Sequence, residues 1–132
     1  MPLAFPMTLA ALVAAILVYI YAGMKVGQAR GRFGVAAPQV HGHPEFERIF
    51  RAHQNTLEQL VIFVPLIVMV AMLFGDLWAA IYGGLWVIGR ILYIESYARA
   101  AEKRLLGFIL SGLGSMLAAV ACAIGLLLHF IA

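Results

Sequence analysis

The chain has 132 residues, of which 64% are hydrophobic and only 11% are charged, and its mean hydropathy is +0.99. This composition excludes an ordinary soluble domain, because no soluble fold needs so much apolar surface. The formal net charge is +3, and its meaning depends on where the few charged residues lie.

The apolar residues are grouped into four long segments. Residues 1–24, 59–75 and 105–132 contain no Asp, Glu, Lys or Arg, and residues 77–94 contain only Arg90. A membrane-spanning helix needs roughly 20 mainly apolar residues. We therefore expect an all-α, integral membrane four-helix bundle, forming one domain over residues 1–132. The expected spans cover about 3–24, 45–74, 77–99 and 105–130.

The first helix is expected over residues 3–24. No basic residue precedes it and no clear cleavage site follows it, so we expect a retained span rather than a signal peptide. The connection over residues 25–44 is rich in Gly, Arg and His. Connections of that length without structure are uncommon unless they are functional or disordered. His41 and His43 have no convincing third ligand nearby, so we predict no metal site.

The second helix, expected over residues 45–74, carries a polar stripe near its start. Arg51, Asn55 and Glu58 occupy positions i, i+4 and i+7, which lie within about 60° of one another at 3.6 residues per turn. Ionisable groups inside a membrane are costly, face the protein interior and mark a functional site by default. A turn at Gly75–Asp76 leads directly into the third helix, which predicts an antiparallel hairpin.

The third helix, expected over residues 77–99, returns toward the level of that stripe. Arg90, Tyr93 and Tyr97 share an arc of about 60°. The two tyrosines therefore come near the level of Arg51 on the second helix, while Arg90 lies deeper.

Two ion pairs are expected from depth and spacing. Arg90 needs a partner inside the membrane, and Glu58 is the carboxylate at matching depth. Glu95 and Arg99 stand at i and i+4 on the opposite arc and are expected to pair.

The fourth helix is expected to begin just after Arg104 and to run to about Phe130. Small residues on it provide faces for close helix packing; they are Gly107, Ser111, Gly114 and Ser115.

The basic residues predict the topology. Of the nine Lys and Arg residues, all except Arg90 lie in or beside the first and third connections. By the positive-inside rule these two connections are cytoplasmic and both termini lie on the opposite side. A four-span protein has no room for a duplex-binding surface, so no nucleic-acid partner is predicted. The basic rim is suited to anionic membrane lipid or to an anionic soluble ligand.

The polar residues expected at one membrane depth have two interpretations. One is a structural network that ties the helices together. The other is a pocket, open to the cytoplasm, for an anionic ligand that forms many hydrogen bonds. No catalytic triad, phosphate loop or Cys/His metal set is present. The residues concerned are Arg30, Arg51, Asn55, Glu58, Tyr93, Tyr97 and Arg104.

Three motifs resemble the signature of the MAPEG family, the membrane-associated proteins in eicosanoid and glutathione metabolism. They are Glu45-Phe46-Glu47-Arg48, the string Arg51-Ala52-His53-Gln54-Asn55-Thr56-Leu57-Glu58, and the set Arg90, Tyr93 and Tyr97-Ala98-Arg99. The string resembles the microsomal glutathione transferase 3 branch, and the arrangement around Tyr93, Tyr97 and Arg104 is similar to leukotriene C4 synthase. The resemblance covers essentially the whole chain.

The resemblance implies a homotrimer that binds glutathione as co-substrate near the cytoplasmic side, between neighbouring subunits. By position, the γ-glutamyl end would be held by Arg51, Asn55, Glu58 and Tyr93, with His53 and Tyr97 also lining the site. Arg30 would reach the glycine carboxylate. Arg104 would be the catalytic residue, beside the cysteine sulfur.

The chemistry that the resemblance implies is conjugation of the glutathione thiolate to a hydrophobic electrophile from the bilayer, or reduction of a lipid hydroperoxide. A nearby arginine favours the thiolate and lowers the thiol pKa. The sequence departs from the synthase pattern at His53, at Gln59, where tyrosine is usual, and at Gly31, where a second consecutive arginine is usual. These departures argue against a dedicated leukotriene synthase.

Two other function classes remain open at this stage. A lipid-binding or scaffold member of the same fold would bind lipid without catalysis. A small four-span transporter would need Glu58 and would show a flux coupled to a proton gradient.

Overall fold

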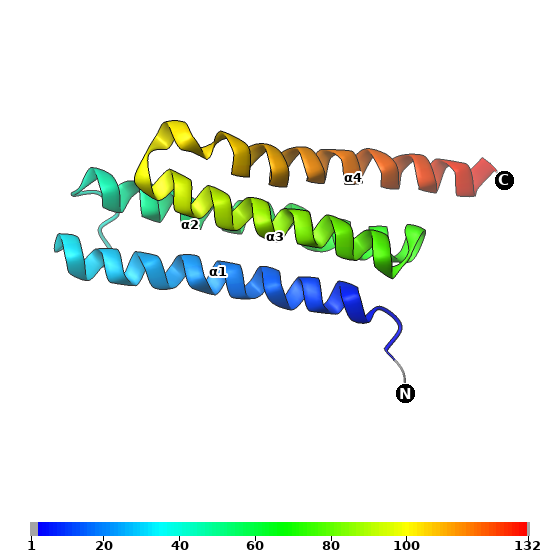
Figure 1. Ribbon diagram of the computed structural model, residues 1–132, viewed down its shortest axis with the longest axis horizontal. Helices are drawn as coiled ribbons and strands as arrows, with labels where there is room; N and C mark the ends of the chain where they lie inside the picture. Colours follow the sequence, from blue (N-terminus) through cyan, green and yellow to red (C-terminus); the bar gives the residue numbers. More distant parts are fainter. Residues whose placement is uncertain (1–2, 132) are drawn as a thin grey trace.

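A computed structural model describes residues 3–131, and within that range the chain is all-helical (Figure 1). The helices are α1 (Pro6–Phe33), α2 (Pro44–Phe74), α3 (Asp76–Arg99) and α4 (Leu105–Ile131), with a short 3-10 helix, η1 (Ala101–Arg104), before α4. Within residues 3–131, four helical segments are long and apolar enough to cross a membrane. The all-α fold class with four such helices is confirmed.

The four helices lie alongside one another, with α3 between α1 and α4 (Figure 1). The α1–α2 and α3–α4 connections lie at one end of the bundle, and the α2–α3 turn and both termini lie at the other. The two basic connections therefore share one end, here called the basic end. Which side of a membrane that end faces stays a prediction.

The first helix is longer than the sequence analysis predicts. It continues past Met24 to Phe33, so about half of the expected 25–44 connection is helical. Ala22, Val26 and Ala29 are buried at helical spacing, which keeps this segment packed on its neighbours. The helix ends at Gly34, whose φ of 66° is left-handed and suits glycine. The predicted end at Met24 is therefore wrong, because the basic residues from Lys25 to Arg32 lie within the helix and do not end it.

The α2–α3 turn is tied to the start of α1 by Asp76. Its carboxylate accepts hydrogen bonds from the backbone N–H groups of Met7 (3.0 Å) and Thr8 (2.7 Å) and from the Thr8 hydroxyl (2.7 Å). Phe5, at the N-cap position of α1, makes no side-chain cap. A carboxylate from a different helix therefore satisfies the free N–H groups at this helix start.

The largest buried cluster draws on all four helices and is centred on α2 and α3. Phe63 of α2 and Trp86 of α3 are fully buried and stack with ring centroids 4.3 Å apart. Ala15 of α1 and Ile67 of α2 belong to the same buried cluster. This packing holds α2 against α3 and so fixes the relative positions of their polar stripes.

The α3 and α4 backbones approach closely at Gly89 and Gly107. A Cβ added at Gly107 would lie 2.4 Å from the Tyr93 nitrogen and 2.6 Å from the Gly89 carbonyl oxygen. Both neighbours are backbone atoms, which cannot move aside as a side chain can. Only glycine permits this approach, and it places the start of α4 beside Tyr93.

We predict that Gly107→Ala lowers the free energy of unfolding by about 1–3 kcal/mol, because the added methyl group forces α3 and α4 apart. The control is Gly112→Ala on the same helix, where an added Cβ meets nothing within 4 Å. That control should be neutral or stabilising by up to about 1 kcal/mol, since alanine is the better helix former. Unfolding in detergent measures both, and equal stability of the two variants would contradict the close approach.

Candidate functional site

A polar pocket of about 350 Å³ lies at the basic end of the bundle, where α2, α3 and the start of α4 meet. Its walls combine two arginines, an asparagine and two tyrosines with two apolar side chains. The lining residues are Arg51, Asn55, Tyr93, Tyr97, Arg104, Leu105 and Phe108.

The α2 side of this pocket is the predicted polar stripe. The Asn55 amide nitrogen donates to Glu58 at 3.1 Å, and the Arg51 guanidinium lies 3.8 Å from the other Glu58 oxygen. The Arg51 and Glu58 side chains are 58% and 55% exposed, so their ion pair is weak and both groups remain available to a ligand.

The α3 and α4 sides carry the aromatic rings and the second arginine of the pocket. Tyr93 is buried, and its ring centroid lies 5.4 Å from that of Tyr97. The Arg104 guanidinium lies over the Tyr97 ring at 5.3 Å, within the range of a cation–π contact. Tyr97 therefore helps to direct Arg104 toward the pocket.

Arg90 lies behind the pocket and is fully buried. Its guanidinium donates to the Asn55 side-chain oxygen at 3.0 Å and stands 4.1 Å from the Tyr93 ring centroid. The predicted Arg90–Glu58 pair is thus wrong: Asn55 stands between the two residues and bonds to both. Since the Asn55 oxygen accepts from Arg90, its NH₂ group is the one that faces Glu58.

The predicted Glu95–Arg99 pair is also replaced by another. Glu95 lies 2.6 Å from the Lys25 ammonium and accepts a hydrogen bond from the Tyr21 hydroxyl. This follows from the longer α1, which carries Lys25 on a helix beside α3 rather than in a loop. The cluster lies on the α1–α3 face, away from the pocket.

Three predicted site residues do not line the pocket of this chain: Glu58, which is held beside it by Asn55, and Arg30 and His53, which lie farther away. Arg30 donates to the carbonyl oxygens of Val35 (3.2 Å) and Gln39 (2.7 Å) at the end of α1. The His53 ring stacks on Tyr19 of α1, with centroids 4.7 Å apart. Arg30 and His53 belong to the α1–α2 part of the bundle, whereas the pocket opens between α2, α3 and α4.

Sequence reasoning missed two lining residues, Leu105 and Phe108. They follow Arg104 at the start of α4, at i+1 and i+4, so the helical spacing contained the signal. A neighbouring recess of about 550 Å³ shares Arg51 and Tyr97 with the pocket and extends over the α1–α2 connection. The polar region is therefore larger than the pocket alone.

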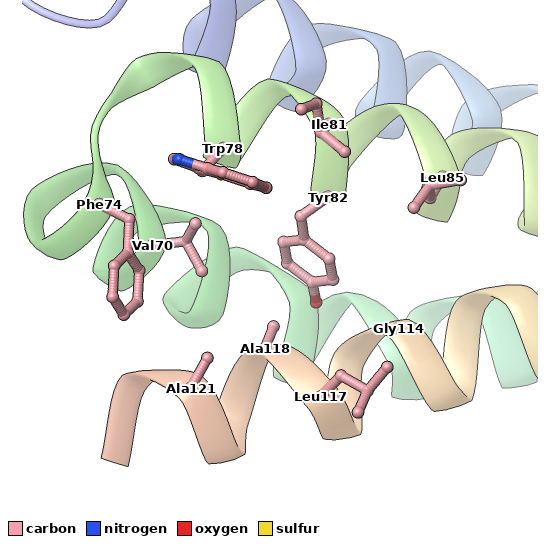
Figure 2. Close-up of a pocket in the computed structure, with 10 residues that line it drawn as sticks. All are labelled: Val70, Phe74, Trp78, Ile81, Tyr82, Leu85, Gly114, Leu117, Ala118 and Ala121. Carbon is pink, nitrogen blue, oxygen red and sulfur yellow. The ribbon is translucent and has the colours of Figure 1, made fainter. Parts of the chain in front are cut away.

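A separate recess of about 350 Å³ lies near the other end, between α2, α3 and α4 (Figure 2). Figure 2 shows Trp78 and Leu85 of α3 on one side and Leu117 of α4 on the other. The Tyr82 hydroxyl points toward α4 and bonds to Ser115 at 2.9 Å. The walls of this recess are almost entirely apolar and carry no free reactive group. It shares no lining residue with the polar pocket.

The chemistry available in the pocket is recognition of an anion. Arg51 and Arg104 supply positive charge, and Asn55 and the tyrosine hydroxyls supply further hydrogen-bonding groups. Glu58, which accepts a hydrogen bond from the lining residue Asn55, is suited to an ammonium group. Among residues 3–131, no group of three or more His, Cys, Asp or Glu side chains could hold a metal ion.

Comparisons with known proteins give a consistent result. A model of the MAPEG family matches residues 8–124. An uncharacterised protein of Synechocystis sp. is 42% identical over 113 residues, covering 86% of this chain and 82% of that protein. Microsomal glutathione S-transferase 2 of Bos taurus is 42% identical over 112 residues, covering 84% of this chain and 76% of that protein. Leukotriene C4 synthase of Bos taurus is 34% identical over 116 residues, covering 88% of this chain and 77% of that protein.

These relatives confirm the family resemblance and the similarity to leukotriene C4 synthase that the motifs indicate. The mammalian transferase reported above is microsomal glutathione S-transferase 2. The resemblance to the microsomal glutathione transferase 3 branch therefore stays a prediction.

We predict that Asn55 and Arg90 are energetically coupled. Asn55→Ala should cost about 1.5–3 kcal/mol of unfolding free energy, because it removes a hydrogen bond to a buried charge. In an Arg90→Met background the same substitution should cost much less. A double-mutant cycle in detergent measures the coupling. Additive costs would show that the hydrogen bond contributes nothing.

Proposed function

Because this chain belongs to the MAPEG family, we propose that it is a membrane glutathione transferase that conjugates the glutathione thiolate to hydrophobic electrophiles. The observation that carries the proposal is the pocket at the basic end, where Arg51 and Arg104 face one space together with Asn55 and two tyrosines. Relatives named as a glutathione S-transferase and as leukotriene C4 synthase support glutathione-related transferase chemistry.

The charges of the pocket match the charges of glutathione. Arg51 and Asn55 bind the γ-glutamyl carboxylate, and Glu58, already held by Asn55, binds the ammonium group. Tyr93 lies beside them and donates from its hydroxyl. The peptide then extends toward Arg104, which places the cysteine sulfur beside the guanidinium.

Arg104 supplies the catalytic effect by stabilising the thiolate. A free thiol with a pKa near 8.5 is mostly protonated at neutral pH, and a cation within about 4–6 Å favours the anion. The thiol proton leaves to solvent, and the sulfur lone pair forms a C–S bond at the electrophilic carbon. The electrons displaced there leave with the leaving group or take up a proton from water.

The second substrate arrives from the bilayer along the apolar wall formed by Leu105 and Phe108, which are 62% and 50% exposed. With a lipid hydroperoxide, the thiolate attacks the terminal peroxide oxygen, the O–O bond breaks, and the departing alkoxide takes a proton from water to become the alcohol. A second glutathione then converts the resulting sulfenic acid to the disulfide and water. We include this reduction as a second reaction of the same site.

We further propose that the functional unit is a homotrimer with the site between subunits. Glu58 lies about 25 Å along α2 from the Gly75 turn, which is within a hydrocarbon core about 30 Å thick. Its side chain is half exposed in the single chain, a costly arrangement in lipid. A neighbouring subunit removes this cost, and it supplies Arg30 and His53, which the pocket of one chain lacks. The basic end then faces the cytoplasm.

We predict that Arg104→Ala abolishes the ultraviolet absorbance of bound glutathione thiolate. The pH profile of conjugation should move up to the ordinary thiol range, near pKa 8.5, because the stabilising cation is gone. Lys103→Ala is the matched control: it removes the neighbouring exposed cation and should leave the profile unchanged.

Calorimetry with glutathione separates the other function classes. Wild-type protein that binds no glutathione would overturn the transferase proposal. Lipid binding without catalysis would then favour a scaffold, and a proton-coupled flux that needs Glu58 would favour a transporter.

We predict that subunits carrying Arg104→Ala and Arg30→Gln complement each other when they are coexpressed. In a ring of three, each mixed trimer has one junction at which an intact Arg104 meets an intact Arg30 of the next subunit. Random mixing should restore about one quarter of the wild-type sites. Two inactive variants that stay inactive together would show that both residues serve the same subunit.

A further inference from the structure

A second polar pocket, of about 290 Å³, lies at the basic end on the face formed by α1 and α3. It is separate from the proposed glutathione site, with which it shares no lining residue. Its polar lining groups from α1 and α3 include Lys25, Arg32, Glu95 and Arg99, and Glu45 at the start of α2 completes the rim.

The rim of this pocket has more positive than negative charge. Three cations face two carboxylates, and the closest contact is between Lys25 and Glu95, at 2.6 Å. Arg32 lies 3.4 Å from Glu45, but its side chain is 70% exposed, so this pair is loose. In the part of the chain that the structure describes, Arg99 forms no ion pair. Two guanidinium groups can therefore reach an anion at this rim.

An apolar strip leads away from the pocket along the same two helices. On α1, Leu17 stands eight residues before Lys25, about two helical turns, and is 58% exposed. On α3, Ile88 and Ile91 precede Glu95 by seven and four residues and are 54% and 40% exposed. A cationic rim and a hydrocarbon-binding strip thus follow one another along the membrane normal.

We propose that this pocket binds the phosphate of an anionic phospholipid, whose acyl chains lie along the α1–α3 strip. Guanidinium groups bind phosphate oxygens in a bidentate manner, which suits Arg32 and Arg99. The pocket lies at the end of the spans, at the level where headgroups are found, and Tyr21 on the same face is an interfacial residue type. A soluble anion would use the rim but leave the strip without a role.

This lipid site does not depend on the proposed transferase activity, and its test needs no glutathione. The purified full-length protein in detergent is mixed with dioleoyl phosphatidylglycerol, with dioleoyl phosphatidylcholine or with glycerol 3-phosphate. Bound molecules are counted by native mass spectrometry. The variants are Arg99→Gln and, as a matched control, Lys103→Gln, which removes a cation at the same end but outside the pocket.

We expect wild-type protein to bind phosphatidylglycerol in preference to phosphatidylcholine and to bind glycerol 3-phosphate little. Arg99→Gln should weaken phosphatidylglycerol binding about fivefold, the contribution typical of one basic residue near an anionic lipid surface. Lys103→Gln should keep the wild-type affinity. If Arg99→Gln does not fold, Arg32→Gln replaces it with the same expected loss.

Three results would overturn the proposal. Equal weakening by Arg99→Gln and Lys103→Gln would mean that only overall charge matters. Binding of glycerol 3-phosphate as tight as that of the lipid would identify a soluble anion as the ligand. A change in oligomer mass caused by Arg99→Gln or Arg32→Gln would identify the α1–α3 face as a contact between copies of this chain.

Discussion

The burial of the Arg90 guanidinium between α2 and α3 is the constraint on which the rest of the candidate site depends. A charge at this depth is tolerated only with partners, and Arg90 has two: the Asn55 oxygen and the Tyr93 ring. The contact with Asn55 also decides which way the amide points, so Glu58 receives the NH₂ group. One buried cation thus orients residues of two helices toward a common pocket.

The pocket also depends on backbone geometry that has no chemical role. Gly89 and Gly107 let α3 and α4 approach closely, and this approach puts Arg104 and the first turn of α4 beside Tyr93 and Tyr97. At the far end, Asp76 links the α2–α3 turn to the start of α1. The packing of the bundle and the position of the arginines are therefore parts of one arrangement.

The pocket around Arg51 and Arg104 and the pocket around Arg32 and Arg99 lie on different faces of the bundle, and each face is suited to a different kind of ligand. The α2–α4 side gathers Arg51 and Arg104 around a space for a soluble anion, in agreement with the proposed glutathione chemistry. The α1–α3 side joins a loosely paired cationic rim to an exposed apolar strip, which is the pattern expected for a lipid. The basic residues at this one end can thus orient the protein in the membrane, bind an anionic substrate and bind an anionic lipid.

The sequence by itself determined the four helices, the hairpin of α2 and α3, and the stripe of Arg51, Asn55 and Glu58, because hydrophobic runs and helical spacing are local properties. It failed at the end of α1, since packing of Ala22, Val26 and Ala29 carries that helix through a charged segment. It also failed for the partners of Arg90 and Glu95, because ion pairing depends on which helices become neighbours. Only the tertiary structure decided these contacts, since residues far apart in the chain meet through packing that no local pattern encodes.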